Sequence, residues 1–215
     1  MPTLIYGRRQ ISLRIVYAGP GLGGKTTNLE QLERLVAGAE GQLTQIPTAG
    51  ERTVGGDFLP VGAEALGEWT PRFQLATVPG QLQYAGAREI LLRNVDVVVF
   101  VADSLRLRRP ANRAALDELH RTLAEGGRDP RRVPLVLQYN KRDLADILTV
   151  TEMDAELNPA GAPAVASIAT SAIGVVEAFG EAVSLALGEA ERFLSPRSDA
   201  APLAVSIPET DHPHQ

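Results

Sequence analysis

The chain of 215 residues contains no cysteine. This absence excludes disulfide bonds, thiolate metal sites and prenyl or palmitoyl anchors attached to cysteine. Pro2 stands where N-myristoylation requires glycine, so we expect no lipid anchor. Basic residues are also few: 21 Lys and Arg face 26 Asp and Glu, and the formal net charge is −5. Because nucleic-acid binding requires an excess of basic side chains, we expect no nucleic-acid partner.

Long hydrophobic stretches are missing as well. No apolar run approaches the roughly 20 residues of a membrane-spanning helix, and the first residues lack the pattern of a secretory signal. We therefore expect a cytoplasmic protein that meets the inner membrane or a cell pole through partners, or a membrane through a transient surface contact. The apolar share of 44% and the charged share of 22% are typical of a globular domain. We expect one domain over residues 1–194 and a tail over residues 195–215, whose prolines and small polar residues predict disorder.

The most specific motif covers residues 19–26, which read Gly-Pro-Gly-Leu-Gly-Gly-Lys-Thr and fit the pattern G-x-x-x-x-G-K-T. It lies between a strand-like run over residues 11–17 and a helical pattern over residues 27–36, the context in which this pattern forms a phosphate-binding loop. Glycines let backbone amides surround phosphate oxygens, and the start of a helix points further amides at the same anion. Lys25 can reach the β- and γ-phosphates, and the Thr26 hydroxyl can bind Mg²⁺. The predicted ligand is a nucleoside triphosphate, and its predicted phosphate-binding residues are Gly19, Gly21, Leu22, Gly23, Gly24, Lys25, Thr26 and Thr27.

Apolar runs of strand length alternate with amphipathic helical patterns along the rest of the chain. The run over residues 96–103 reads Asp-Val-Val-Val-Phe-Val-Ala-Asp, which is typical of a strand buried on both faces of a parallel sheet. The alternation predicts an α/β fold with a mostly parallel, doubly wound sheet flanked by helices, which binds ligands at the carboxyl ends of its strands. Further strands are predicted over residues 57–63, 70–78, 133–139 and 164–169, and further helices over residues 84–92, 111–125 and 174–194.

A second motif, Asn140-Lys141-Arg142-Asp143, directly follows a predicted buried strand and fits the N-K-x-D pattern that recognises guanine. The Asp143 carboxylate can accept from guanine N1–H and the exocyclic amine together, whereas adenine would leave it unpaired. Asn140 would orient the base, and the Lys141 stem would cover one face of the ring. A backbone amide of the short loop after the last predicted strand can donate to guanine O6. The predicted guanine-binding residues are Asn140, Lys141, Asp143, Ser171 and Ala172.

Two further segments fit a site that hydrolyses a nucleoside triphosphate. In Thr77-Val78-Pro79-Gly80-Gln81, the Gly80 amide can donate to the γ-phosphate and Gln81 can orient the attacking water. In Glu51-Arg52-Thr53, the Thr53 hydroxyl can complete Mg²⁺ coordination, since this cation prefers oxygen ligands. The adjacent Arg52 can neutralise charge in the transition state, although an arginine in a surface ion pair explains it about equally well.

Together these motifs resemble the MglA family of bacterial small Ras-like GTPases, which act in cell polarity and gliding motility. The resemblance runs from about residue 11 to residue 193 and is carried by Gly-Pro-Gly-Leu in the phosphate loop, Thr26-Thr27-Asn28, Glu51-Arg52-Thr53, Asp57-Phe58-Leu59-Pro60 and Thr77-Val78-Pro79-Gly80-Gln81. Threonine at position 77, where most eukaryotic relatives have Asp, is typical of the family. The resemblance implies a P-loop NTPase with a Ras-like G domain that hydrolyses GTP.

The resemblance also implies residue roles and partners. Lys25, Gln81 and Arg52 would be catalytic, with Arg52 as an arginine finger in the same chain, and Thr26 and Thr53 would bind Mg²⁺. The expected partners are GTP or GDP, a homodimeric roadblock-type activator similar to MglB, and polarity effectors that recruit the GTP state to a cell pole. Gly55-Gly56 departs from the family, because bulky apolar residues are expected there. This departure predicts a diverged paralogue with its own partner.

Two other functions fit some of the same motifs. A docking module would bind GTP and scarcely hydrolyse it, and a P-loop ATPase or kinase would lack the N-K-x-D element. Two groups of arginines are interpreted as a solvated basic rim, with an acidic partner or a polar membrane landmark as the minority alternative. The rim consists of Arg106, Arg108, Arg109, Arg113, Arg128, Arg131 and Arg132.

Overall fold

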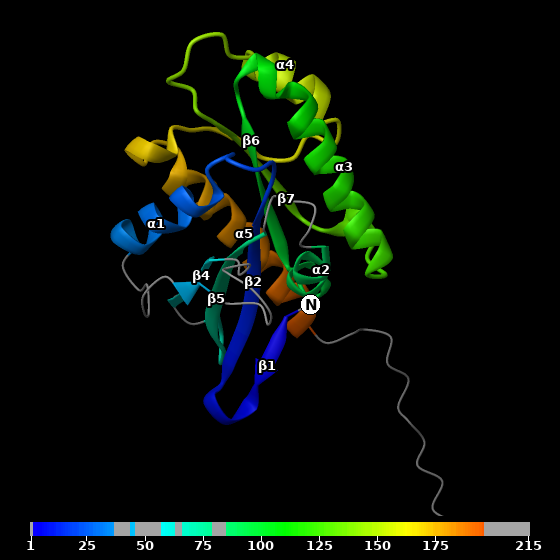
Figure 1. Ribbon diagram of the computed structural model, residues 1–215. Helices are drawn as coiled ribbons and strands as arrows, with labels where there is room; N and C mark the ends of the chain where they lie inside the picture. Colours follow the sequence, from blue (N-terminus) through cyan, green and yellow to red (C-terminus); the bar gives the residue numbers. More distant parts are fainter. Residues whose placement is uncertain (1, 37–43, 46–56, 63–65, 79–84, 196–215) are drawn as a thin grey trace, which may run out of the picture.

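The computed structural model describes residues 2–36, 44–45, 57–62, 66–78 and 85–195. These residues form one sheet with helices on both faces (Figure 1). Within these ranges, no helix is long and apolar enough to cross a membrane.

The sheet has the strand order β3-β4-β5-β2-β6-β7-β8, and β1 pairs with β2 outside that path. Strands β5, β2, β6, β7 and β8 run parallel, whereas β4 is antiparallel to β5, β3 to β4, and β1 to β2. The strand bounds are β1 Thr3–Ile5, β2 Gln10–Ala18, β3 Thr44–Gln45, β4 Asp57–Gly62, β5 Thr70–Thr77, β6 Val97–Asp103, β7 Leu135–Asn140 and β8 Ala164–Ala166. The mostly parallel, doubly wound α/β fold expected from the sequence is confirmed.

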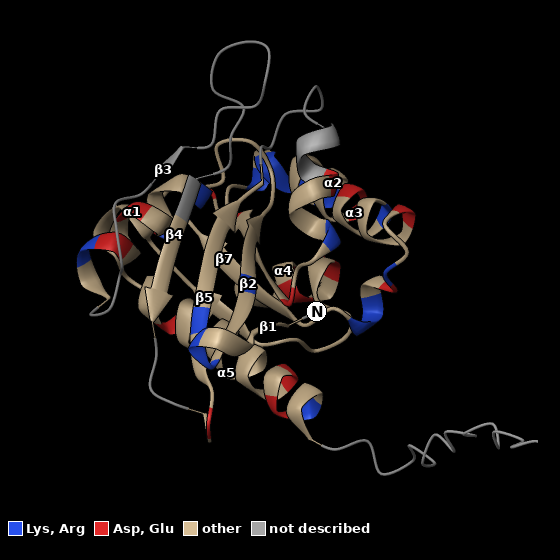
Figure 2. Cartoon of the chain, turned by 90° about the horizontal axis from the view of Figure 1, so that it is seen from below, with Lys and Arg blue, Asp and Glu red and all other residues tan. Residues whose placement is uncertain are grey.

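Helices α1 and α5 cover one face of the sheet, and α2 and α3 cover the other (Figure 1). Their bounds are α1 Lys25–Leu35, α2 Ala85–Arg93, α3 Arg109–Glu125, α4 Val150–Leu157 and α5 Val175–Leu194, and the short 3-10 turns are η1 Tyr6–Arg8, η3 Arg106–Arg108, η4 Pro130–Arg132 and η5 Ala169–Ser171. Charged residues are frequent on the helices, while the central strands carry few of them (Figure 2). This division is what a sheet buried on both faces requires.

Strand β6 shows why the core has two halves. All of its residues are buried, and successive side chains point to opposite faces. Val97, Val99 and Val101 pack with α1 and α5, whereas Val98 and Phe100 pack with α3 and α4. The continuous apolar run in the sequence is therefore two interleaved core faces.

Helix α5 lies close to the sheet because its inner stripe is small. Alanines recur every fourth residue at 178, 182, 186 and 190, and each is fully buried. The helix is preceded by Gly174, whose φ of 73° is in the left-handed region. A Cβ at Gly174 would lie 2.3 Å from the Ala166 carbonyl oxygen, so only glycine fits this entry to the helix.

The structure departs from the sequence expectations in several elements. Strands β1 and β3 and helix α4 were not predicted. The predicted strand over residues 164–169 is wrong at its end, because β8 stops at Ala166 and residues 169–171 form a 3-10 turn. The reason is a side-chain contact: the Ala169 amide donates to Asn140 Oδ1 (2.9 Å) rather than to a strand neighbour, which turns the chain out of the sheet.

Candidate nucleotide site

The predicted motifs meet at the carboxyl edge of the sheet. The phosphate loop follows β2, the Asn-Lys-x-Asp segment begins at the end of β7, and the Ser171-Ala172 segment follows β8 (Figure 1). Strands β2, β6, β7 and β8 are parallel, so these ends share one edge. The predicted hydrolysis residues Arg52, Thr53, Gly80 and Gln81, and also Gly55-Gly56, lie outside the described residues.

Two glycines of the phosphate loop are required by space and backbone angle. Gly19 has φ 131°, and a Cβ there would lie 2.3 Å from the Val101 carbonyl oxygen. Gly24 has φ 103°, and a Cβ there would lie 2.3 Å from the Asn140 side-chain nitrogen. The loop is thus pressed against β6 on one side and the Asn-Lys-x-Asp segment on the other.

Lys25 begins α1 and is buried under the phosphate loop. Its Nζ donates to the carbonyl oxygens of Gly19 (3.0 Å) and Pro20 (2.7 Å). The ammonium therefore lies inside the curve of the loop, where a phosphate chain would meet it. The neighbouring Thr26 side chain is exposed in the first turn of α1, and the Thr27 side chain is half-buried.

Asn28, one turn further along α1, locks the start of the helix to the sheet. Its Nδ2 donates to the Gly24 carbonyl (2.9 Å), and its Oδ1 accepts from Gln138 Nε2 on β7 (2.8 Å). Both side chains are fully buried. The backbone N–H groups of the first turn of α1 are thereby held at the edge of the sheet where an anion would bind.

Asn140 connects the phosphate loop to the other two segments. Its Nδ2 donates to the Gly23 carbonyl (2.8 Å), and its Oδ1 accepts from the Ala169 amide (2.9 Å) and from the Ser167 hydroxyl (3.2 Å). The side chain is buried, so these hydrogen bonds form away from water. One carboxamide thus joins the phosphate, Asn-Lys-x-Asp and Ser171-Ala172 segments.

Lys141 and Asp143, which follow Asn140 in the same motif, differ in their contacts. Lys141 has φ 67°, and its Nζ pairs with the buried Asp103 carboxylate at the end of β6 (2.7 Å). Asp143 is exposed, and its carboxylate has no hydrogen-bond partner among the described residues. It can therefore accept from a base without first breaking a protein contact.

The amides of Ser171 and Ala172 donate within their own turn. Ser171 N–H donates to the Ile168 carbonyl (3.0 Å) and Ala172 N–H to the Ala169 carbonyl (3.1 Å). Ala172 has φ 62°, which ends the 3-10 turn. To donate to guanine O6, the Ala172 amide must either bond two acceptors at once or give up its hydrogen bond to the Ala169 carbonyl. The contact with guanine O6 therefore stays a prediction.

Arg108 belongs to the site although the sequence placed it on a solvated rim. Its Nη2 donates to the Gly21 carbonyl (2.7 Å), and its Nε lies 3.5 Å from Asp103 Oδ2. Asp103 is 1% exposed, so its charge is compensated by Lys141 and Arg108 together. Position alone gave no signal for this contact, because it joins residues 87 apart in the chain. By contrast, Arg106 and Arg109 form exposed ion pairs with Glu152 and Glu156, as the interpretation of a solvated rim requires.

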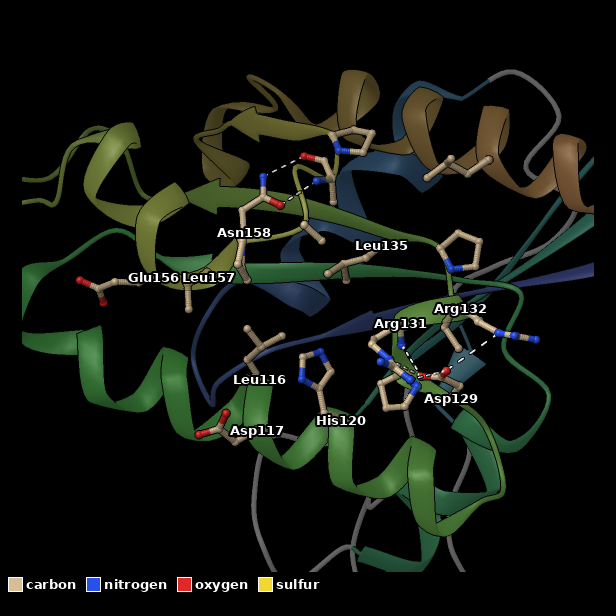
Figure 3. A pocket seen from close by; sticks show the side chains of 18 of the residues that line it. Leu116, Asp117, His120, Asp129, Arg131, Arg132, Leu135, Glu156, Leu157 and Asn158 are labelled. Carbon is tan, nitrogen blue, oxygen red and sulfur yellow. Dashed lines mark hydrogen bonds and ion pairs between the residues drawn. The ribbon is translucent and has the colours of Figure 1, made fainter.

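A large hollow lies away from these motifs (Figure 3). It has a volume of about 1220 Å³ and is bounded by α3, η4, the start of β7, the end of α4 with the chain after it, and the second half of α5. Leu116, Leu135 and Leu157 line it together with polar residues such as His120 and Asn158. Of the predicted nucleotide-binding residues that the structure describes, none lines it, since it lies at the opposite end of β7 from Asn140.

A phosphate loop joined through a buried asparagine to an Asn-Lys-x-Asp segment, at the edge of a doubly wound sheet, defines a GTP-binding protein of the small GTPase class. Residues 4–176 match the model of the ADP-ribosylation factor (Arf) family. The chain is also 41% identical over 193 residues to "Mutual gliding-motility protein MglA" of Myxococcus xanthus (strain DK1622), a match that covers 89% of this chain and 99% of the relative. The chain therefore belongs to the MglA family of small GTPases, binds guanine nucleotides and hydrolyses GTP.

Proposed function

We propose that the chain is a nucleotide-dependent switch in bacterial cell polarity or motility, GTP-bound in one state and GDP-bound in the other. The observation that carries the proposal is the Asn140 carboxamide, which fixes the phosphate loop and the base-recognition segments to each other. The printed name of the Myxococcus relative supports the link to motility.

The described residues divide the nucleotide between them. Lys25 binds the β- and γ-phosphates, together with the backbone amides of the phosphate loop from Gly21 to Thr27. Asp143 accepts from the guanine N1–H and amine. Asn140 and Lys141 hold the Asn-Lys-x-Asp segment in place for the ring, through Gly23 and Asp103 respectively. The exposed carboxylate of Asp143 makes this pairing possible without rearrangement.

A Mg²⁺ ion fits the start of α1. The exposed hydroxyl of Thr26 is an oxygen ligand of the kind that Mg²⁺ prefers, and the Thr53 hydroxyl is proposed as its counterpart. When bound, the ion would neutralise charge on the β- and γ-phosphate oxygens. Lys25 would supply further positive charge to the same phosphates.

Hydrolysis is proposed to depend on Gln81, Arg52 and Gly80, with a homodimeric roadblock-type activator similar to MglB bringing them into place. Gln81 orients the attacking water, Arg52 neutralises charge in the transition state, and the Gly80 amide donates to the γ-phosphate. In the presence of that activator, Arg52→Ala should slow hydrolysis by about 10³-fold or more. An unchanged rate would refute the role of Arg52.

The proposal is tested first by competition between guanine and adenine nucleotides for nucleotide-free protein in Mg²⁺. GTP and GDP should win by about 10⁴-fold, because adenine leaves Asp143 unpaired. Asp143→Asn should weaken the binding of GDP and strengthen the binding of xanthosine diphosphate, since an amide donor then faces the 2-oxo group of xanthine. The control is Asp117→Asn on α3, an exposed aspartate far from the motifs, which should change neither affinity. Equal binding of ATP and GTP would overturn the assignment.

Single-turnover hydrolysis of preloaded GTP separates the switch from a docking module. Slow cleavage that the activator accelerates supports the switch. Retention of GTP over many hours with the activator present would favour the docking module.

A further inference from the structure

The phosphate loop contains a turn that its sequence disfavours. The Gly23 amide donates to the Pro20 carbonyl (3.2 Å), which closes a four-residue turn with Gly21 and Leu22 at its centre. Of these two central residues only Leu22 has a positive φ, 64°, which is the pattern of a type II turn. That position usually holds glycine or asparagine, because a Cβ clashes there. The Leu22 side chain is 87% exposed, so packing of this side chain does not hold the turn.

The central peptide of this turn is the bond between Gly21 and Leu22. Types I and II differ mainly by a half-turn rotation of this peptide plane, and in type I the third residue takes the negative φ that leucine prefers. All described peptide bonds are trans, so the Gly21 carbonyl and the Leu22 amide point in opposite directions. Whichever way the carbonyl is held, the amide faces the other way.

Arg108 holds that carbonyl. Its Nη2 lies 2.7 Å from the Gly21 oxygen, and a hydrogen bond from a guanidinium is stronger than one between neutral groups. Asp103, itself buried and paired with Lys141, lies 3.5 Å from Arg108 Nε and keeps the guanidinium in place. The Leu22 amide is therefore directed away from Arg108.

We propose that Arg108 is a positioning residue that holds the Gly21–Leu22 peptide in its type II orientation, so that the Leu22 amide donates to the bound phosphates. The inference rests on the proposed phosphate site. Without Arg108, the preference of Leu22 for negative φ rotates the peptide and turns a carbonyl oxygen toward the phosphate chain. A phosphate-binding amide is then lost and an acceptor takes its place.

The test is a double-mutant cycle on the dissociation rate of a fluorescent GDP analogue in Mg²⁺. Arg108→Ala should speed release about tenfold, corresponding to about 1.4 kcal/mol. In a Leu22→Gly background the same substitution should change release by less than about threefold, because glycine has no preference for negative φ. Arg109→Ala is the matched control: it removes a neighbouring exposed arginine that pairs with Glu156, and it should leave release unchanged.

The cycle separates the proposal from simpler roles of Arg108. If the arginine acts only through its charge or through fold stability, its removal costs the same with leucine or glycine at position 22, and the proposal is overturned. It is also overturned if Arg108→Ala does not change release. Arg108→Lys, which keeps a charged donor, should give an intermediate rate, and it replaces the alanine variant if that variant unfolds. If the wild-type chain binds no GDP, the proposed function fails before this inference is reached.

Discussion

The carboxamide of Asn140 uses both of its ends, and this makes it the most informative single residue in the structure. Its nitrogen donates to the phosphate loop at Gly23, while its oxygen accepts from Ala169 in the segment after β8. An ionised aspartate has the same shape but can only accept. The donor end can therefore be tested without changing volume.

Asn140→Asp should weaken GDP binding by about 10- to 100-fold. The substitution places a carboxylate against the Gly23 carbonyl, and a buried acceptor left without its donor costs about 1–3 kcal/mol. Isothermal titration of GDP measures the loss. The control is Asn94→Asp, at an exposed position after α2, which should bind GDP as the wild type does. Equal affinity of Asn140→Asp and wild type would contradict the linking role.

The sequence offered candidate site residues where the spacing is local and none where the contacts are distant. Lys25, Asn140 and Asp143 lie in short motifs that carry their own context, and the structure brings these motifs to one edge of the sheet. Arg108 reaches Gly21 only through the fold, and an arginine near other arginines is normally a solvated one. The sequence around Arg108 has no periodicity or spacing that predicts the contact with Gly21.

At the level of elements, α4 was missed although its first residues carry a signal. Thr149 and Glu152 form a capping box, in which each side chain bonds to the backbone of the other. The helix has only eight residues, so periodicity was weak and the Thr-x-x-Glu spacing was the usable sign. The end of β8 had no such sign, because Asn140 determines it from another strand.

The cap of α4 should make stability depend on acid pH. Hydrogen bonds from Arg106, and then from Thr149, lower the pKa of Glu152 to about 2 from 4.5. Because the folded-state pKa is depressed, the charged form stabilises the fold above pH 4.5, and this contribution is lost as the pH falls toward 2. Glu152→Gln should therefore lower the melting temperature at neutral pH, and the difference should shrink below pH 4.5.

Thermal denaturation of both proteins between neutral pH and about pH 3 measures this dependence. Glu181→Gln is the control, since Glu181 is exposed on α5 and has no ion pair among the described residues. Its melting temperature should follow the wild type at every pH. A constant difference between Glu152→Gln and wild type across the range would show that the charge of Glu152 is not the cause.

Two glycines, Gly180 within helix α5 and Gly174 directly before it, have opposite expected responses to alanine. Gly180 is exposed within the helix and a Cβ there would meet nothing within 4 Å, so Gly180→Ala should stabilise the fold by about 0.5–1 kcal/mol. Gly174, at the start of the helix, would place a Cβ 2.3 Å from the Ala166 carbonyl, so Gly174→Ala should destabilise by more than about 1 kcal/mol. Urea unfolding measures both, and stabilisation by both variants would contradict the packing at the entry to α5.

For the whole molecule, the alternation of apolar runs predicted the layers but not the strand order. A continuous apolar run such as that of β6 indicates a strand that is buried on both faces, and such a strand lies in the centre of the sheet. Which strands become its neighbours depends on pairings between distant segments, such as β2 with both β5 and β6. No local pattern records those pairings.

The folded unit should end with α5. Leu194 packs against the core at the last turn of that helix, and Ser195 caps it by bonding to the Glu191 carbonyl (2.8 Å). A chain ending after Ser195 should keep its melting temperature within about 1 °C and its GDP affinity within about twofold. Differential scanning calorimetry and GDP titration check both values, and a clear fall in either would place residues 196–215 within the functional unit.

The Asn140 carboxamide connects the phosphate loop to the segment after β8, and this connection bears on the length of ligand that the site accepts. GDP is in effect a bivalent ligand, with a base at one end and a phosphate chain at the other. Since Asn140 holds the two subsites at a fixed span, the second end of the nucleotide reaches its subsite at a high effective concentration once the first is bound. Guanosine and pyrophosphate, supplied as separate molecules, lack this advantage because no covalent link joins them. We therefore expect the site to bind an intact nucleotide more tightly than its separate fragments.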